Sequence, residues 1–216
     1  MRFMNKMLNR LFEFGKRENY FILKPLKEIS DRMCESEEFE LIDFDETKKR
    51  VVAEANQSTR SSCDGLEIGE NINFIEFKSF VKVKKQFYKN ENLEKKEDEF
   101  ILSMEDSLID KIEASLWILE FILHHKNFLV TNEEKKIYRN TLKKYYLVVD
   151  IDLSKNSKER LFTQLNALAT IPNSLYDNLI IKVKDILNDI DEYNIKIEKP
   201  KLIDCNELKS ICKGFK

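Results

Sequence analysis

The segment 61–80, SSCDGLEIGENINFIEFKSF, constrains the fold of this chain more than any other stretch. The chain has only four glycines, and two of them, Gly65 and Gly69, lie close together in this segment. Glycine tolerates the backbone angles that tight turns and bulges require. Residues 72–80 are rich in aromatic and β-branched side chains and have the length of a strand. The segment therefore predicts a β-hairpin, and with it a β-sheet.

Two acidic residues and one lysine lie along this predicted hairpin. Period two along the second strand sets Glu76 and Lys78 on the same face. Because their neighbours are apolar, the strand is predicted to be buried on both faces, where an unpartnered charge is costly. Asp64 on the adjoining strand is the nearest candidate partner. Two carboxylates can hold Mg²⁺ or Mn²⁺ through oxygen ligands, and a neighbouring lysine can serve an attacking water.

This arrangement resembles the PD-(D/E)XK nuclease superfamily, with Asp64 at the start of one strand and Glu76, Phe77 and Lys78 on the next. The resemblance implies a metal-dependent endonuclease that hydrolyses phosphodiester bonds of DNA, with RNA as the less favoured substrate. It also implies that Asp64, Glu76 and the carbonyl of Phe77 bind Mg²⁺ or Mn²⁺, and that Lys78 serves the water. Cys63 stands before Asp64 where proline is common, at a position that varies within the superfamily.

The order of the predicted elements is the second ground for the resemblance. The superfamily core runs helix, three antiparallel strands with the motif on the last two, helix, strand. The sequence predicts a helix over 26–34, strands over 39–44 and 51–55 around a polar turn, the hairpin, a helix over 99–125 and a buried strand over 145–151. The resemblance covers about 26–151 and implies an α/β (α+β) fold: a restriction-endonuclease-like core with a mixed sheet of four to five strands flanked by helices.

The 216 residues are predicted to form a single domain. An amphipathic helix over 2–15 precedes the core, and a helical extension over 152–216 follows it. The remaining predicted elements are a loop over 90–98, helices over 157–169 and 175–187, and an edge strand over 193–198.

Two basic residues beside the hairpin are candidates for binding nucleic acid. Arg60 lies in the polar segment 57–62, where an ordinary connection is the favoured interpretation. Lys82 begins a tract of lysines and aromatic residues over 82–89, for which a backbone-guiding role and a solvated connection have equal weight. The net charge of −2 does not favour nucleic-acid binding, but a metal site can reverse the field locally.

Other interpretations of the hairpin stay open. Asp64, Glu76 and Lys78 form a simple cross-strand ion pair in one of them. In another, the chain is a catalytically silent, nuclease-like module that binds nucleic acid or a protein partner. A homodimer also stays open, because one sequence reveals no self-complementary surface.

Histidines and cysteines offer no alternative metal site. His124 and His125 are adjacent at the end of the predicted helix 99–125, so their side chains diverge and a capping or solvent-facing role is expected. The four cysteines contain no CxxC pair, and without a signal peptide they predict reduced thiols and a cytoplasmic location. No apolar run approaches the roughly 20 residues that span a bilayer, so no membrane partner is expected.

Overall fold

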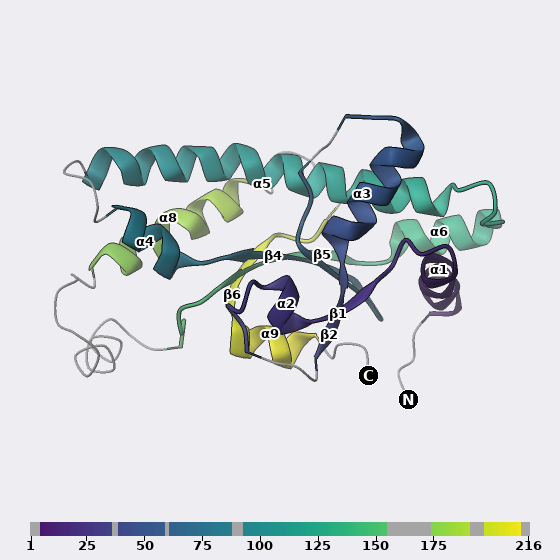
Figure 1. The fold of residues 1–216 in the computed structure, drawn as a ribbon, viewed down its shortest axis with the longest axis horizontal. Helices are drawn as coiled ribbons and strands as arrows, with labels where there is room; N and C mark the ends of the chain where they lie inside the picture. Colours follow the sequence, from purple (N-terminus) through teal and green to yellow (C-terminus); the bar gives the residue numbers. More distant parts are fainter. Residues whose placement is uncertain are drawn as a thin grey trace.

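A computed structural model describes residues 5–35, 39–58, 61–87, 93–154, 174–190 and 197–212. Within these ranges, six strands form one sheet in the order of the sequence (Figure 1). They are β1 (Leu23–Pro25), β2 (Glu40–Asp43), β3 (Gly65–Ile68), β4 (Ile72–Lys78), β5 (Lys143–Val149) and β6 (Lys201–Asp204). β1 to β4 pair antiparallel, whereas β5 pairs parallel with both β4 and β6.

The parallel pairs require crossover connections, and helices provide them. Three helices lie between β4 and β5 in the chain: α4 (Phe80–Phe87), α5 (Leu93–Leu123) and α6 (Asn132–Asn140). Between β5 and β6, the structure describes α8 (Ser174–Asp189). The predicted helices 99–125 and 175–187 are confirmed as α5 and α8.

Helices cover both faces of the sheet. On one face, α5, α8, α1 (Lys6–Arg17) and α3 (Phe44–Ala55) join a core with Leu66, Phe74 and Leu147. On the other face, α2 (Leu26–Ile29) and α9 (Cys205–Ile211) cover Ile75 and Tyr146. Figure 1 shows α5 running along one side of the sheet, with α2 and α9 on the other. Strand alternation explains the division, because neighbouring residues of β4 point to opposite faces.

The strand predicted over 51–55 and the polar turn before it are wrong, because both belong to the helix α3. Asp43 caps this helix by accepting a hydrogen bond from the backbone N–H of Glu46, at 3.1 Å. The acidic side chains of Asp45 and Glu46 lie in its first turn, where they favour the positive end of the helix dipole. These start signals outweigh the β propensity of Val51 and its neighbour.

Two further predictions differ from the structure, and a third lies mostly outside the described residues. The helix expected over 26–34 ends at Ile29, because Asp31 and Arg32 adopt positive φ angles of 49° and 63° that a right-handed helix cannot contain. Residues 193–196 of the predicted edge strand 193–198 lie outside the described residues, and the last strand that the structure describes is β6, beyond Pro200. The sheet has six strands among the described residues rather than four to five, because β1 and β6 extend it at both edges.

Other predicted elements are confirmed in part or lie outside the described residues. The N-terminal helix is present as Lys6–Arg17, and the buried strand 145–151 is present as Lys143–Val149. The expected loop 90–98 overlaps the start of α5 at Leu93, so that prediction is wrong from there onward. The predicted helix 157–169 lies outside the described residues.

The prediction that all cysteines are reduced is wrong, because Cys34 and Cys205 form a disulfide. Cys34 follows α2 and Cys205 begins α9, so the bond joins segments 171 residues apart in the sequence. Cys63 and Cys212 are buried and do not take part in this disulfide. Because disulfides are rare in a reducing cytosol, the cysteines no longer support the predicted cytoplasmic location.

None of the helices in the described ranges combines the length and the apolar character that crossing a bilayer requires.

Candidate active site

The predicted hairpin 61–80 is present as β3 and β4, and it brings Asp64 and Glu76 together. Gly65 pairs with Ile75 in the register, so the next step along both strands sets Asp64 opposite Glu76. The backbone N–H of Asp64 donates to the carbonyl of Ile75 at 3.0 Å, which continues the pairing beyond β3. Directly opposite residues of an antiparallel pair share a face. The two carboxylates therefore face the same side of the sheet.

The carboxylate of Asp64 is held by the backbone of the neighbouring strand. Its Oδ2 accepts a hydrogen bond from the N–H of Phe77 at 2.7 Å. The Asp64 carbonyl accepts another from the N–H of Phe44, at the start of α3. Phe77 thus contributes through its N–H, and the role of its carbonyl as a metal ligand stays a prediction.

Glu76 is buried beneath α5, where Lys111 reaches it. The Lys111 Nζ lies 2.5 Å from Glu76 Oε1, with only 18% of the lysine side chain and 4% of the glutamate side chain exposed. The second carboxylate oxygen, Glu76 Oε2, is buried and has no hydrogen-bond partner among the described residues. A buried polar atom without a partner is costly, so this oxygen has an unused capacity to bind a cation or a donor.

Both carboxyl groups hold their protons more tightly than usual. Burial, reinforced by the charge of Asp64, raises the pKa of Glu76 to about 7. Burial also raises the pKa of Asp64, against the opposing effects of the Phe77 hydrogen bond and the Lys111 charge. Burial is the largest single effect on the pKa of Lys111 and lowers it, but the charge of Glu76, its hydrogen bond and the charge of Asp64 together outweigh burial, so the pKa is raised. The cluster therefore holds more negative charge than its surroundings readily accommodate.

Lys78 lies two residues beyond Glu76 at the end of β4, so it shares that face of the strand. It is half-buried, and its positive charge acts to lower the pKa of both Asp64 and Glu76, although burial dominates at each. The structure thus brings together the three residues that the sequence predicted as catalytic.

The two predicted nucleic-acid contacts are less informative. Arg60 lies outside the described residues. Lys82 lies in the first turn of α4 with an exposed side chain, and it forms an ion pair with Asp31. Exposed pairs of this kind contribute little stability, so the pair does not prevent Lys82 from contacting another anion.

Lys111 and Tyr145 belong to the same cluster, and sequence reasoning missed both. The Tyr145 hydroxyl is buried and has no partner among the residues that the structure describes. Burial raises its pKa most, and the charge of Glu76 raises it further. Tyr145 pairs with Phe74, which precedes Glu76 by two residues on β4. Tyr145 therefore lies beside Glu76 on the same face of the sheet. A signal for Lys111 was present, since it follows Leu108 by three residues and so interrupts the apolar stripe of a predicted helix.

The donor set fits a hard divalent cation in part. Asp64 and Glu76 supply carboxylate oxygens, the ligands that Mg²⁺ prefers, and Mg²⁺ commonly keeps several waters beside one or two carboxylates. In the part of the chain that the structure describes, no group of three or more His, Cys, Asp or Glu side chains is placed to hold a metal. A metal at this position would therefore be bound by two carboxylates, backbone oxygen and water.

Comparison of the chain with protein-family models, with curated proteins and with solved structures found no match.

Proposed function

We propose that this protein is a metal-dependent nuclease that hydrolyses phosphodiester bonds at the Asp64–Glu76–Lys78 cluster. The observation that carries the proposal is the pair of opposed carboxylates at the end of a hairpin, with Glu76 Oε2 buried and without a partner in the part of the chain that the structure describes. A carboxylate pair with spare coordination capacity suits Mg²⁺ or Mn²⁺. DNA is the favoured substrate in this proposal, and RNA is the second.

The connectivity around the site supports the same proposal. Strands β2, β3 and β4 are antiparallel, and the three predicted catalytic residues lie on or beside the last two of them. Helix α5 and the parallel strand β5 follow. Apart from the additional helices α3, α4 and α6, this is the order of elements expected for the restriction-endonuclease-like core that the sequence resembles. Because one fold hosts many functions, the argument for activity rests on the site rather than on this order.

Each residue has a distinct task in the proposed reaction. Asp64 and Glu76 hold the cation, which when bound polarises the phosphate and lowers the pKa of a water. The Phe77 N–H fixes the orientation of the Asp64 carboxylate through its 2.7 Å hydrogen bond. Lys78 supplies a positive charge that offsets the negative charge developing on the phosphate. The positive charge of Lys111 reduces the electrostatic repulsion between the two buried carboxylates.

The test is cleavage of single- and double-stranded DNA and RNA with Mg²⁺, with Mn²⁺, and with EDTA. We expect cleavage that requires the metal and that falls by at least about 100-fold in Asp64→Asn and in Lys78→Ala, the scale on which removal of one transition-state contact acts.

Two matched controls separate catalysis from general effects of charge. Asp110→Asn removes an exposed carboxylate from α5, and Lys126→Ala removes an exposed lysine just past its end. Both should leave cleavage unchanged. Well-folded wild type that cuts no substrate with either metal would contradict the proposal, and so would cleavage that survives in Asp64→Asn.

One observation favours a second candidate, a catalytically silent module of the same fold. The ammonium group of Lys111 already contacts Glu76 Oε1, so it can neutralise the cluster in place of a metal. In that case the protein would bind no Mg²⁺ at the hairpin, and titration calorimetry would show no metal-binding difference between wild type and Asp64→Asn. A titration with nucleic acid on the same samples would then test for binding without cleavage.

A further inference from the structure

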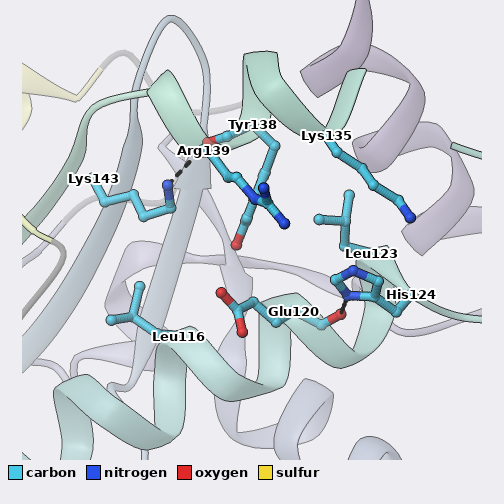
Figure 2. A pocket seen from close by; sticks show the side chains of 8 residues that line it. All are labelled: Leu116, Glu120, Leu123, His124, Lys135, Tyr138, Arg139 and Lys143. Atoms are coloured by element: carbon cyan, nitrogen blue, oxygen red, sulfur yellow. Dashed lines mark hydrogen bonds between the residues drawn. The ribbon is translucent and has the colours of Figure 1, made fainter. Parts of the chain in front are cut away.

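A cavity of about 460 Å³ lies between the C-terminal part of α5 and helix α6. Figure 2 shows the side chains of both helices directed toward it from opposite sides. It shares no residue with the Asp64–Glu76 cluster. Its nearest wall residues on α5 begin at Leu116, five positions beyond Lys111. The volume falls within the range of roughly 300 to 1,000 Å³ that is typical of small-molecule sites.

The charge of the lining is mostly positive. Lys135 and Arg139 lie four residues apart on α6, so both face the cavity. Neither side chain forms an ion pair or a hydrogen bond with any residue in the described ranges. Lys143, at the start of β5, adds a third positive charge, and its Nζ donates to the carbonyls of Tyr138 and Thr141. Two unpaired cations on one wall favour an anion.

Polar groups on the other side of the cavity can recognise a second part of a ligand. The His124 Nδ1 donates to the Glu120 carbonyl at 2.8 Å, which leaves the other ring nitrogen of a neutral histidine as an acceptor. The carboxylate of Glu120 faces the cavity in Figure 2 and is the single acidic group among the lining residues. Leu116 and Leu123 supply apolar surface between these groups.

A buried hydroxyl in the wall of this cavity is a further sign of a ligand site. Within the described ranges the Tyr138 hydroxyl has no hydrogen-bond partner, and its side chain is directed toward Glu120 in Figure 2. Only 2% of Tyr138 is exposed, so solvent does not satisfy this group. A buried donor without a partner is costly unless a ligand or an ordered water accepts from it.

We propose that this cavity binds a small phosphate ester whose body carries a hydrogen-bond donor, such as a mononucleotide. The phosphate lies against Lys135 and Arg139, because a dianion matches two unpaired cations and arginine binds phosphate with two parallel hydrogen bonds. The body lies over the two leucines, with its donor directed to Glu120. This inference does not depend on the proposed nuclease activity.

The test is titration calorimetry of the full chain with AMP, ribose 5-phosphate, inorganic phosphate and adenosine. We expect saturable binding of AMP, weaker binding of inorganic phosphate, and no binding of adenosine. Arg139→Ala and Lys135→Ala should each weaken AMP binding by about tenfold to a hundredfold, the contribution of one charge-assisted hydrogen bond. Glu120→Gln should weaken the binding of AMP but not of inorganic phosphate.

Lys136→Ala is the matched control, because Lys136 is an exposed neighbour on the same helix that does not line the cavity. It should leave the affinity for AMP unchanged. The proposal is overturned if no phosphorylated probe binds, or if Arg139→Ala binds AMP as wild type does. Tighter binding of a 5′-phosphorylated oligonucleotide than of AMP would overturn the assignment to a small molecule in favour of a strand end.

Discussion

Removal of the Lys111 ammonium group should destabilise the protein by an amount that depends on pH. In the variant Lys111→Met, the buried Glu76 loses the ammonium group that lies 2.5 Å from its Oε1. Loss of one partner of a buried ion pair costs about 3–5 kcal/mol, because the remaining charge is left uncompensated. Glu76 can avoid this cost by staying protonated, so the destabilisation depends on pH.

The destabilisation by Lys111→Met should be larger at high pH, because the pKa of Glu76 is raised from 4.5 to about 7 in the folded protein. Near pH 5, folded Glu76 is protonated in both proteins, so the variant loses little electrostatic energy. Above pH 7, Glu76 is ionised in wild type, whereas in the variant its pKa is higher still. The destabilisation should therefore grow by up to about 1.4 kcal/mol per pH unit above 7, until Glu76 of the variant also ionises.

Urea unfolding at several pH values between 5 and 9, in EDTA, measures this effect. Trp117 is the only tryptophan and lies on α5 against Phe121, so its fluorescence reports on the helix that carries Lys111. Lys126→Met, which removes an exposed lysine, should show no such trend. A cost of Lys111→Met that is the same from pH 5 to pH 9 would refute the reasoning.

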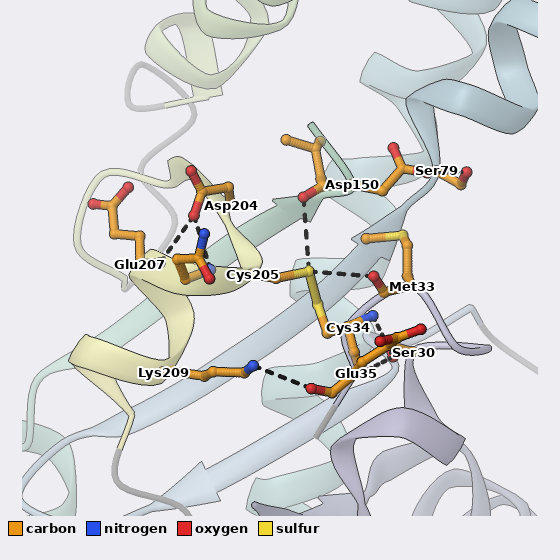
Figure 3. The surroundings of a disulfide bond; sticks show 12 residues. Ser30, Met33, Cys34, Glu35, Ser79, Asp150, Asp204, Cys205, Glu207 and Lys209 are labelled. Carbon is orange, nitrogen blue, oxygen red and sulfur yellow. Dashed lines mark hydrogen bonds between the residues drawn. A yellow bond between two sulfur atoms is a disulfide. The ribbon is translucent and has the colours of Figure 1, made fainter. Parts of the chain in front are cut away.

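Three other predictions follow from the geometry. By binding the folded state, Mg²⁺ should stabilise wild type by about 2.7 kcal/mol at 100 times Kd and so raise its melting temperature, whereas the melting temperature of Asp64→Asn should not change. Gly15→Ala should cost about 1–3 kcal/mol in urea unfolding, because an added Cβ would lie 2.1 Å from Cδ2 of the Phe21 ring; unchanged stability would show that the ring moves freely. The disulfide from Cys34 to Cys205 in Figure 3 closes a span of 171 residues, so reduction should lower stability by about 2–5 kcal/mol, whereas Cys34→Ser should be insensitive to the reductant.

Local signals were sufficient for the hairpin and for the elements with strong periodicity. The pair of glycines and the aromatic and β-branched composition of 72–80 predicted β4, and the period of two along a strand predicted the common face of Glu76 and Lys78. The 3.6-residue stripe predicted α5, whose observed start at Leu93 is earlier than expected. In these segments, side-chain pattern and backbone propensity favour the same structure.

Elements whose local signals conflict were predicted less well. Val51 and Val52 favour a strand in isolation, but the cap at Asp43 and burial against the sheet make them part of α3. The cysteines carry no spacing signal, and the partners Cys34 and Cys205 meet only because α2 and α9 lie on the same face of the sheet.

The sequence by itself determined the hairpin and the three charged residues along it, because strand period and turn chemistry act over a few residues. Only the tertiary structure decided which groups surround them. Lys111 reaches Glu76 across 35 positions, and Tyr145 approaches through the parallel pairing of β4 with β5. Such contacts depend on strand register and on how a helix crosses the sheet, and these are set by packing of the whole core rather than by any local pattern.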